Sequence, residues 1–251
     1  MLSKAQISLI TSLQHKKFRK QHGLFMVEGI KSVLEFISSE YHVHSLYATA
    51  DAFAKMGNLP QKLKYTEVSA AEIRKISALN TPQGVLALVH LPATDDIHWD
   101  SVRSQHCLVL DGVQDPGNLG TIIRTAEWFG LKNIICSPGT VDAYNPKVVQ
   151  ATMGSLARIH VHYTDLDPFL KTGKMPIYGA LLEGNSVYET DFGNAGFIIL
   201  GNEGNGISRE MMEKIDHAVT IPRVGQAESL NVAIATTVFC SEIARQKLSK
   251  H

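Results

Sequence analysis

The sequence predicts an α/β protein with two domains, the larger of which is built on a parallel sheet. Its 251 residues are more than one compact core needs and are enough for two. The second half alternates short apolar segments with helical patterns, which is typical of a parallel sheet covered by helices on both faces. The stretch 91–96 combines a proline with acidic residues after an apolar segment, as a linker does.

The first part of the chain predicts a small α/β domain over residues 1–95, followed by a linker over 96–105. Apolar residues recur at helical spacing across 30–37, so a helix is expected there. A second helix is expected near 71–76. Short apolar or β-branched segments predict strands, the first of them a strand or turn, at 25–29, 44–49, 65–68 and 84–89.

The second part predicts a parallel-sheet domain over residues 106–251. Ligands of such sheets bind beyond the carboxyl ends of the strands, so polar loops at those ends are the candidate sites. The expected strands are 107–110, 133–136, 159–163, 177–182, 197–200 and 218–221.

The composition is that of an ordinary globular protein, with 44% hydrophobic and 19% charged residues. No apolar run approaches the roughly 20 residues that span a bilayer, so no membrane partner is expected. The N-terminus lacks the pattern of a signal peptide, which predicts a cytosolic protein. Cys107, Cys136 and Cys240 lie in apolar stretches and are expected to be buried free thiols, not disulfides or zinc ligands.

The charge is unevenly spread along a chain whose formal net charge is zero. By itself a neutral chain does not indicate a nucleic-acid partner. Residues 1–97, however, carry 11 Lys and Arg against 8 Asp and Glu. The basic excess includes Lys16, Lys17, Arg19 and Lys20, which either contact phosphate or form a solvated helix face.

The first polar segment follows the strand 107–110. A Pro-Gly turn leads to Asn118, which is a suitable N-cap for the helix that follows. Arg124 lies in the first two turns of that helix and is expected to face the ligand crevice. The alternative is a surface arginine paired with Glu127 or Asp115.

The second polar segment is a loop with three glycines, Gly201, Gly204 and Gly206, after an apolar strand. Glycines allow close approach to a ligand, although a tight turn without a ligand is the commoner reason for such a loop. The pattern is neither the dinucleotide fingerprint nor the phosphate loop. Glu203 would repel phosphate and fits a positively charged ligand better.

The third polar segment connects the strand 218–221 to a long apolar helix. Ser229 is expected to cap that helix, and Asn231 follows two residues later. Both side chains either bind a ligand or serve only as a cap and a satisfied amide.

The joint order of these three segments resembles the SpoU (TrmH-like) family of RNA 2′-O-ribose methyltransferases, within the SPOUT superfamily. The matching words are Asn-x-Gly-x-x-x-Arg, Leu-Gly-x-Glu-Gly-x-Gly and Ile-Pro-(x)₆-Ser-Leu-Asn-Val, and the resemblance covers about 111–245. Words at 17–20, 25–29 and 81–87 are similar to the substrate-binding domain that precedes some of these enzymes.

The resemblance implies a C-terminal domain with a deep trefoil knot, a homodimer and S-adenosylmethionine as the cofactor. Knots are almost absent from proteins, and nothing in the periodicity predicts one. No metal is expected. The residues that match or lie near the cofactor site of the family are Leu182, Leu200, Gly201, Asn202, Gly206, Ile221, Ser229 and Leu230.

Arg124 matches the catalytic arginine of the family. A guanidinium is a poor base because its pKa lies above ~12. We therefore expect Arg124 to orient the RNA phosphate and to stabilise developing alkoxide charge, with a direct base role as the alternative. The other catalytic candidates are Asn118, Glu203, Ser229 and Asn231. The RNA-binding candidates are Lys16, Lys17, Arg19, Lys20 and Arg124.

The resemblance implies transfer of a methyl group to a ribose 2′-hydroxyl of structured RNA, and the N-terminal domain favours 23S-type ribosomal RNA. The alternatives are a tRNA 2′-O-methyltransferase or a non-catalytic RNA-binding protein of the same fold. A nucleotide-dependent oxidoreductase is a further alternative, against which the missing dinucleotide fingerprint argues.

Overall fold

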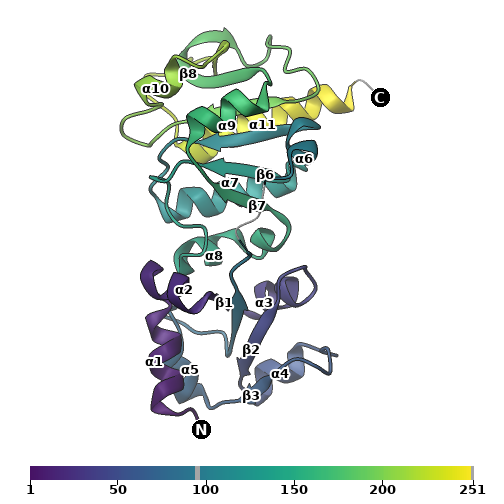
Figure 1. Cartoon of the computed structure of the whole chain (residues 1–251), viewed down its shortest axis with the longest axis vertical. Coiled ribbons are helices and arrows are strands. Elements are labelled where there is room, and N and C mark those ends of the chain that lie inside the picture. The colour runs from purple at the N-terminus through teal and green to yellow at the C-terminus, as the bar shows by residue number, and fades with distance from the viewer. Residues whose placement is uncertain (94–96, 250–251) are drawn as a thin grey trace. The chain divides into compact units, whose positions relative to one another are not determined.

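The computed structural model describes residues 1–93 and 97–249, which form two α/β units (Figure 1). The N-terminal unit comprises Met1–Asp95 together with Asp142–Ala157, and the C-terminal unit comprises Asp96–Val141 together with Arg158–His251. The predicted domain boundary at residues 95 and 96 lies outside the described residues.

The N-terminal unit contains a four-stranded sheet in the order β1-β4-β2-β3. The strand β4 is antiparallel to both of its neighbours, whereas β2 and β3 are parallel. All four strands expected from the sequence are present, with small shifts at their ends. They are β1 (Leu24–Glu28), β2 (Val43–Ala48), β3 (Tyr65–Glu67) and β4 (Val85–His90).

Helices cover both faces of this sheet, with α1 and α5 on one face and α3 and α4 on the other (Figure 1). Ile10, Ile73 and Ile76 pack against the sheet residues Leu86 and Leu88, so that α1 and α5 share one core. The helices along this part of the chain are α1 (Lys4–Ser12), α2 (Lys16–His22), α3 (Ile30–Ile37), α4 (Ala50–Lys55) and α5 (Ala70–Ile76).

A segment from the second half of the chain completes the N-terminal unit. The sequence predicts one continuous domain over 106–251, but Asp142–Ala157 packs with the N-terminal residues instead. It contains α8 (Pro146–Thr152), which lies against β1. Tyr144 packs on Phe25 with ring centroids 4.8 Å apart. This apolar contact and the ion pair between Arg19 and Asp142 hold the segment in the N-terminal unit.

The C-terminal unit contains a six-stranded sheet in the order β10-β8-β9-β5-β6-β7. Every neighbouring pair is parallel, which confirms the predicted parallel α/β sheet. The central strands β5, β6 and β9 are buried along their whole length because helices cover both faces. The strands are β5 (His106–Leu110), β6 (Asn133–Cys136), β7 (His160–Tyr163), β8 (Ile177–Ser186), β9 (Gly196–Leu200) and β10 (His217–Thr220).

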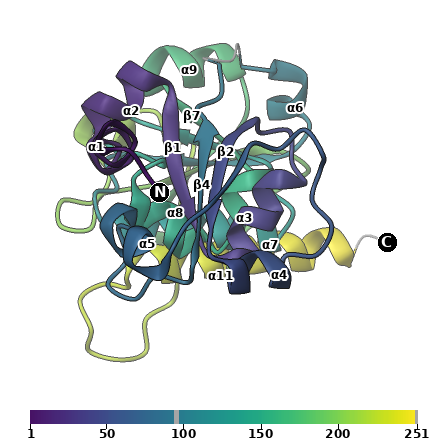
Figure 2. The same cartoon turned by 90° about the horizontal axis from the view of Figure 1, so that it is seen from below.

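The helices of the C-terminal unit include one inside the predicted linker. Trp99 of α6 stacks on Phe169 of α9 with ring centroids 5.0 Å apart, so much of 96–105 is part of the folded unit. The helices α7 and α11 lie side by side (Figure 2). The helices of this unit are α6 (Trp99–Arg103), α7 (Pro116–Trp128), α9 (Leu166–Gly173), α10 (Arg209–Met212) and α11 (Val232–Leu248).

The three cysteines are free and buried, as predicted. Burial raises the pKa of the Cys107 and Cys240 thiols to about 12 and that of Cys136 further still. Within residues 1–93 and 97–249, no helix is both long and apolar enough to cross a membrane.

Candidate active site

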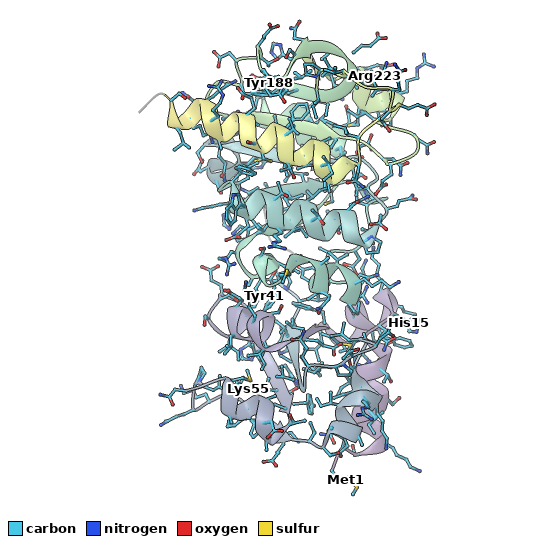
Figure 3. The ribbon with its side chains drawn as sticks, turned by 180° about the vertical axis from the view of Figure 1, so that it is seen from behind. Met1, His15, Tyr41, Lys55, Tyr188 and Arg223 are labelled. Atoms are coloured by element: carbon cyan, nitrogen blue, oxygen red, sulfur yellow. The ribbon has the colours of Figure 1, made fainter. Side chains whose placement is uncertain are left out.

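The three polar segments of the sequence leave the same edge of the C-terminal sheet. They follow β5, β9 and β10, and the carboxyl ends of parallel strands meet at one edge. The loop after β10 is exposed along Pro222–Asn231 and projects from the sheet edge (Figure 2). Arg223, near the start of this loop, donates to the Ala227 carbonyl at 3.1 Å (Figure 3).

One chain of hydrogen bonds joins a residue from each of the three segments. The Asn118 amide nitrogen donates to Glu203 Oε1 at 3.0 Å. The Asn118 amide oxygen accepts a hydrogen bond from Asn231 Nδ2 at 2.9 Å. Three of the predicted catalytic residues are therefore in direct contact, although they come from distant parts of the sequence.

The Glu203 carboxylate also binds the backbone of the first segment. Its two oxygens accept hydrogen bonds from the amides of Gln114 and Asp115, each at 3.1 Å. Partial burial raises the pKa of Glu203, but the hydrogen bonds from Asn118 and from the backbone outweigh burial and hold the pKa below its usual value. Glu203 is thus kept ionised while it fixes the loop before α7.

The helix caps differ from those expected. Asp115, not Asn118, caps α7, because its side chain accepts from the Asn118 backbone amide at 2.8 Å. Asn231, not Ser229, caps α11 by accepting from the amides of Ala233 and Ile234. The dipeptide Asp115-Pro116 is itself a cap signal, since proline is favoured at the first helical position. Each cap places an asparagine amide at the sheet edge.

The glycine-rich loop is a tight turn closed by its own backbone. Asn202 and Gly206 exchange two backbone hydrogen bonds, at 2.9 and 3.0 Å. A Cβ atom on Gly201 would lie 2.1 Å from the Gly206 carbonyl carbon and 2.2 Å from the Ile207 nitrogen. The glycine at 201 is required by this backbone crossing, which agrees with the tight turn that the sequence analysis gave as the commoner reason for such a loop. Close approach of this glycine to a ligand stays a prediction.

Two further side chains attach this turn to the end of β5. Asn202 Nδ2 donates to the Gly112 carbonyl at 2.8 Å, and Asp111 accepts from the Ser208 amide at 2.8 Å. The expected role of Asn202 was cofactor contact, yet its amide is engaged in holding the loops together. Asp111 is a structural side chain of the site to which the sequence assigned no role.

A second loop supports the end of β5 from the side of β6. Ser137 Oγ accepts from the Gly112 amide at 2.9 Å, and Thr140 Oγ1 donates to the Leu110 carbonyl at 3.1 Å. The Val141 amide donates to the Val113 carbonyl at 2.9 Å. The segment that leads to Asn118 is therefore held between two loops.

The predicted cofactor residues fall into two groups. Leu182 on β8 and Leu230 before α11 expose 74% and 50% of their surface, and Ile221 directly follows β10. Leu200 differs, because only 1% of it is exposed and its carbonyl accepts from the Asp111 amide. The Leu200 side chain is therefore buried in the sheet, and contact of this residue with a cofactor stays a prediction.

The remaining predicted catalytic residues lie at the surface. Arg124 is exposed on α7, on the same helix face as Thr121 and Trp128. Ser229 lies in the exposed loop before the Asn231 cap. Glu127 pairs with Arg158 at 2.9 Å. Arg124 thus projects from the helix whose N-terminus carries the Asn118 network.

The predicted RNA-binding residues of α2 divide by burial. Lys16, Lys17 and Lys20 are exposed. Arg19 is only 2% exposed and pairs with Asp142. The prediction that Arg19 contacts phosphate is therefore wrong. Four basic residues within five positions look alike in the sequence, but only three of them face solvent.

Among the residues that the structure describes, no group of three or more histidine, cysteine or acidic side chains is arranged to hold a metal ion.

A parallel α/β sheet with three linked polar loops at one edge defines a ligand-binding enzyme domain. Residues 105–241 match the SpoU rRNA Methylase family, and residues 4–87 match the MRM3-like substrate binding domain. The chain belongs to the SpoU rRNA methylase family and is an RNA methyltransferase of that family.

Relatives of known name span nearly the whole chain. A 23S rRNA (guanosine(2553)-2′-O)-methyltransferase, RlmP, of Bacillus subtilis is 33% identical over 90% of this chain and 91% of its own length. A putative TrmH-family RNA methyltransferase from Porphyromonas gingivalis is 40% identical, with a TM-score of 0.88 over 98% of this chain and 99% of that one. The SpoU methyltransferase AviRb from Streptomyces viridochromogenes, solved with AdoMet, is 25% identical, with a TM-score of 0.85 over 98% and 99%.

Proposed function

We propose that this protein transfers a methyl group from S-adenosylmethionine to a ribose 2′-hydroxyl of ribosomal RNA. The observation that carries the proposal is the hydrogen-bonded connection of Glu203, Asn118 and Asn231. It joins the three motifs of the family at the sheet edge where parallel α/β domains bind their ligands.

The side chains at this edge fit the proposed cofactor. Exposed leucines, Leu182 and Leu230, offer an apolar surface to an adenine ring. The ionised Glu203 favours a cationic ligand, and S-adenosylmethionine supplies an electrophilic methyl group on a positively charged sulfur. Gly201 and Ile221 line the same edge.

Arg124 is proposed to act on the RNA. Methyl transfer requires the 2′-oxygen in line with the sulfonium methyl, so positioning is a large part of catalysis. The exposed guanidinium of Arg124 orients a phosphate and stabilises alkoxide charge as the hydroxyl loses its proton. The proton then passes to solvent or to a group of the RNA, since a guanidinium is a poor base.

The chain around β10 is proposed to form the trefoil knot of the family. The proposal rests on the family match of residues 105–241. In the sheet β10 pairs with β8, and a Cβ atom on Gly184 would lie 2.4 Å from the Ala218 carbonyl oxygen. Thr220 Oγ1 also donates to the Leu182 carbonyl at 3.0 Å.

A homodimer is proposed, formed through the neighbouring helices α7 and α11. Trp128 on α7 is 81% exposed and Ile234 on α11 is 52% exposed, and exposed apolar side chains of this size favour a protein partner. Light scattering after size exclusion should give twice the chain mass. The protein is proposed to act in the cytosol.

Ribosomal RNA is the proposed substrate because the N-terminal unit matches a substrate-binding domain and the B. subtilis relative is named for 23S rRNA. Exposed Lys16, Lys17 and Lys20 on α2 are proposed phosphate contacts. The alternative substrate is tRNA, and the alternative function is binding of RNA without catalysis.

The test is to map 2′-O-methyl groups in RNA from cells with and without the gene. A ribosomal position that loses its methyl group, and regains it when the purified protein and S-adenosylmethionine are added, supports the proposal. Loss at a tRNA position would support the alternative substrate. Cofactor binding without methyl incorporation into any RNA would support a non-catalytic protein.

A further inference from the structure

The helix α2 presents two different faces. Lys16, Lys17 and Lys20 are exposed, whereas Arg19 is only 2% exposed. A fully charged guanidinium is rarely buried unless it is paired and hydrogen bonded. The partners of Arg19 therefore decide what this helix is attached to.

Arg19 connects α2 to two other segments of the N-terminal unit. Its Nε and Nη2 atoms donate to Asp142 Oδ2 at 3.1 and 2.6 Å. Its Nη1 atom donates to the carbonyls of Leu13 and Gln14, at 2.8 and 2.9 Å. These contacts fix the corner between α1 and α2 against a residue 123 positions further along the chain.

The segment that begins at Asp142 is held firmly in the N-terminal unit. The other oxygen of Asp142 accepts from the Tyr144 amide at 3.1 Å. The hydroxyls of Tyr144 and Tyr41 lie 3.3 Å apart (Tyr41 is labelled in Figure 3), and the Tyr144 ring packs on Phe25. The ion pair is thus the charged part of a larger anchor.

The residues directly before Asp142 belong to the C-terminal unit and support the candidate active site. Val141 is bonded to Val113, and Ser137 is bonded to the Gly112 amide. Gly112 and Val113 lead to the loop that Glu203 binds and to Asn118. A single peptide bond, between 141 and 142, separates the anchor of Arg19 from this support.

We propose that Arg19 and Asp142 form a positioning pair, which fixes the loop 137–141 and through it the catalytic loop at 111–118. The role rests on the proposed methyl transfer. The exposed lysines of α2 are retained when the pair is altered, so we expect the pair to affect turnover more than RNA affinity. Neither residue touches the substrate.

The test compares Asp142→Asn and Arg19→Lys with Tyr144→Phe as a matched control. Tyr144→Phe removes the hydroxyl that contacts Tyr41 and keeps both the ring that packs on Phe25 and the ion pair. For both ion-pair variants we expect kcat on ribosomal RNA to fall on the order of 10-fold, because misplacement of reacting groups by ~1 Å can cost about 10²-fold. The KM for RNA and the Kd for S-adenosylmethionine should stay within about twofold. The double variant should be no worse than the poorer single variant, since the pair acts as one unit.

Hydrogen exchange gives a readout that does not depend on activity. In the ion-pair variants the amides of Gly112 and Val141 should exchange at least several-fold faster, whereas in Tyr144→Phe they should match the wild type. Unchanged exchange at both amides, or a kcat equal to that of the control, would overturn the proposal. If the wild-type protein methylates no RNA while exchange still changes as expected, the proposed function fails and the positioning role of the pair stands.

Discussion

The amide of Asn231 donates to the side-chain oxygen of Asn118 at 2.9 Å, across 113 positions of sequence. Asn231 caps α11 and Asn118 lies in the first turn of α7, so one hydrogen bond joins the beginnings of the two helices. Because Asn118 also donates to Glu203, its amide must present both of its polar atoms in fixed directions.

Asn118→Asp should damage the site more than Asn118→Ala. The new carboxylate could still accept from Asn231, but it would replace a donor that lies 3.0 Å from Glu203 Oε1 with a like charge. We expect kcat to fall by roughly 10-fold or more at pH 7.5, because displacement of the reacting groups lowers the rate by such factors. The kcat of Asn118→Asp should approach that of Asn118→Ala as the pH falls, because one of the two neighbouring carboxyls becomes protonated and the repulsion disappears. A pH-independent ratio of the two variants would contradict this electrostatic explanation.

Arg124→Ala should lower the rate of methyl transfer by about 10²–10³-fold, the usual effect of removing one electrostatic donor to developing charge. S-adenosylmethionine should bind as in the wild type, because Arg124 is expected to contact RNA. Single-turnover kinetics and calorimetry measure the two effects separately. Arg124→Lys should recover only part of the rate, since lysine keeps the charge but loses the bidentate geometry. Near-normal turnover of Arg124→Ala would show that the assignment is wrong.

Gly201→Ala should disrupt the turn after β9, because its Cβ atom would lie 2.1 Å from the backbone of Gly206. Gly204→Ala is the matched control, since the nearest atom to its Cβ is Asn202 Oδ1 at 3.6 Å. We expect cofactor affinity to fall at least ~10-fold in the first variant, which corresponds to about 1.4 kcal/mol. The second variant should bind as the wild type does, and equal affinities of the two would contradict the backbone-crossing argument.

The contact between Glu72 and the N-terminus should make α1 and α5 sensitive to acid. Hydrogen bonds from the Ser69 and Leu2 amides hold the pKa of Glu72 at about 2. A lowered pKa contributes stability that is present above the unfolded value, near ~4.3, and is lost as the pH falls toward about 2. The protection factors of the α1 amides, which are corrected for the intrinsic pH dependence of exchange, should therefore fall between these pH values. In Glu72→Gln the same amides should have lower protection factors at neutral pH, and these should depend less on pH.

The cysteines should be unreactive in the folded protein. Burial raises the pKa of Cys107 and Cys240 to about 12, so almost no thiolate exists at pH 8. A thiol reagent should label none of the three cysteines in the native state and all of them after denaturation. Rapid labelling of Cys240 in the native protein would indicate that α11 opens locally.

The central strands of the parallel sheet, β5, β6 and β9, could be predicted because each is a short, mostly apolar run that the fold buries completely. The strand β8 extends to Ser186, beyond the predicted 177–182, and this extension could not be predicted because the second half of the strand is polar and exposed. The helix α6 could not be predicted either, because its five residues follow a stretch that has the composition of a linker. Local composition alone does not reveal the stacking of Trp99 on Phe169, which makes this stretch part of the fold.

The residues of the candidate site could be predicted from the sequence, but the hydrogen bonds between them could not. Asn118, Glu203 and Asn231 were identified by motif, whereas their contact depends on the order of the strands in the sheet. Arg19 illustrates the limit most clearly. Nothing in a basic cluster distinguishes the one residue that turns inward, since its partner, Asp142, is distant in sequence.

The placement of Asp142–Ala157 matters for anyone who recombines these proteins. A chimaera that joins the first 93 residues of one relative to the remainder of another would pair Arg19 and Phe25 with foreign counterparts of Asp142 and Tyr144. The two units are interleaved along the gene. A simple fusion at the apparent linker needs one crossover, whereas exchange of the whole N-terminal unit needs three, because residues 142–157 add two more. Residues 142–157 have to be transplanted together with the N-terminal part.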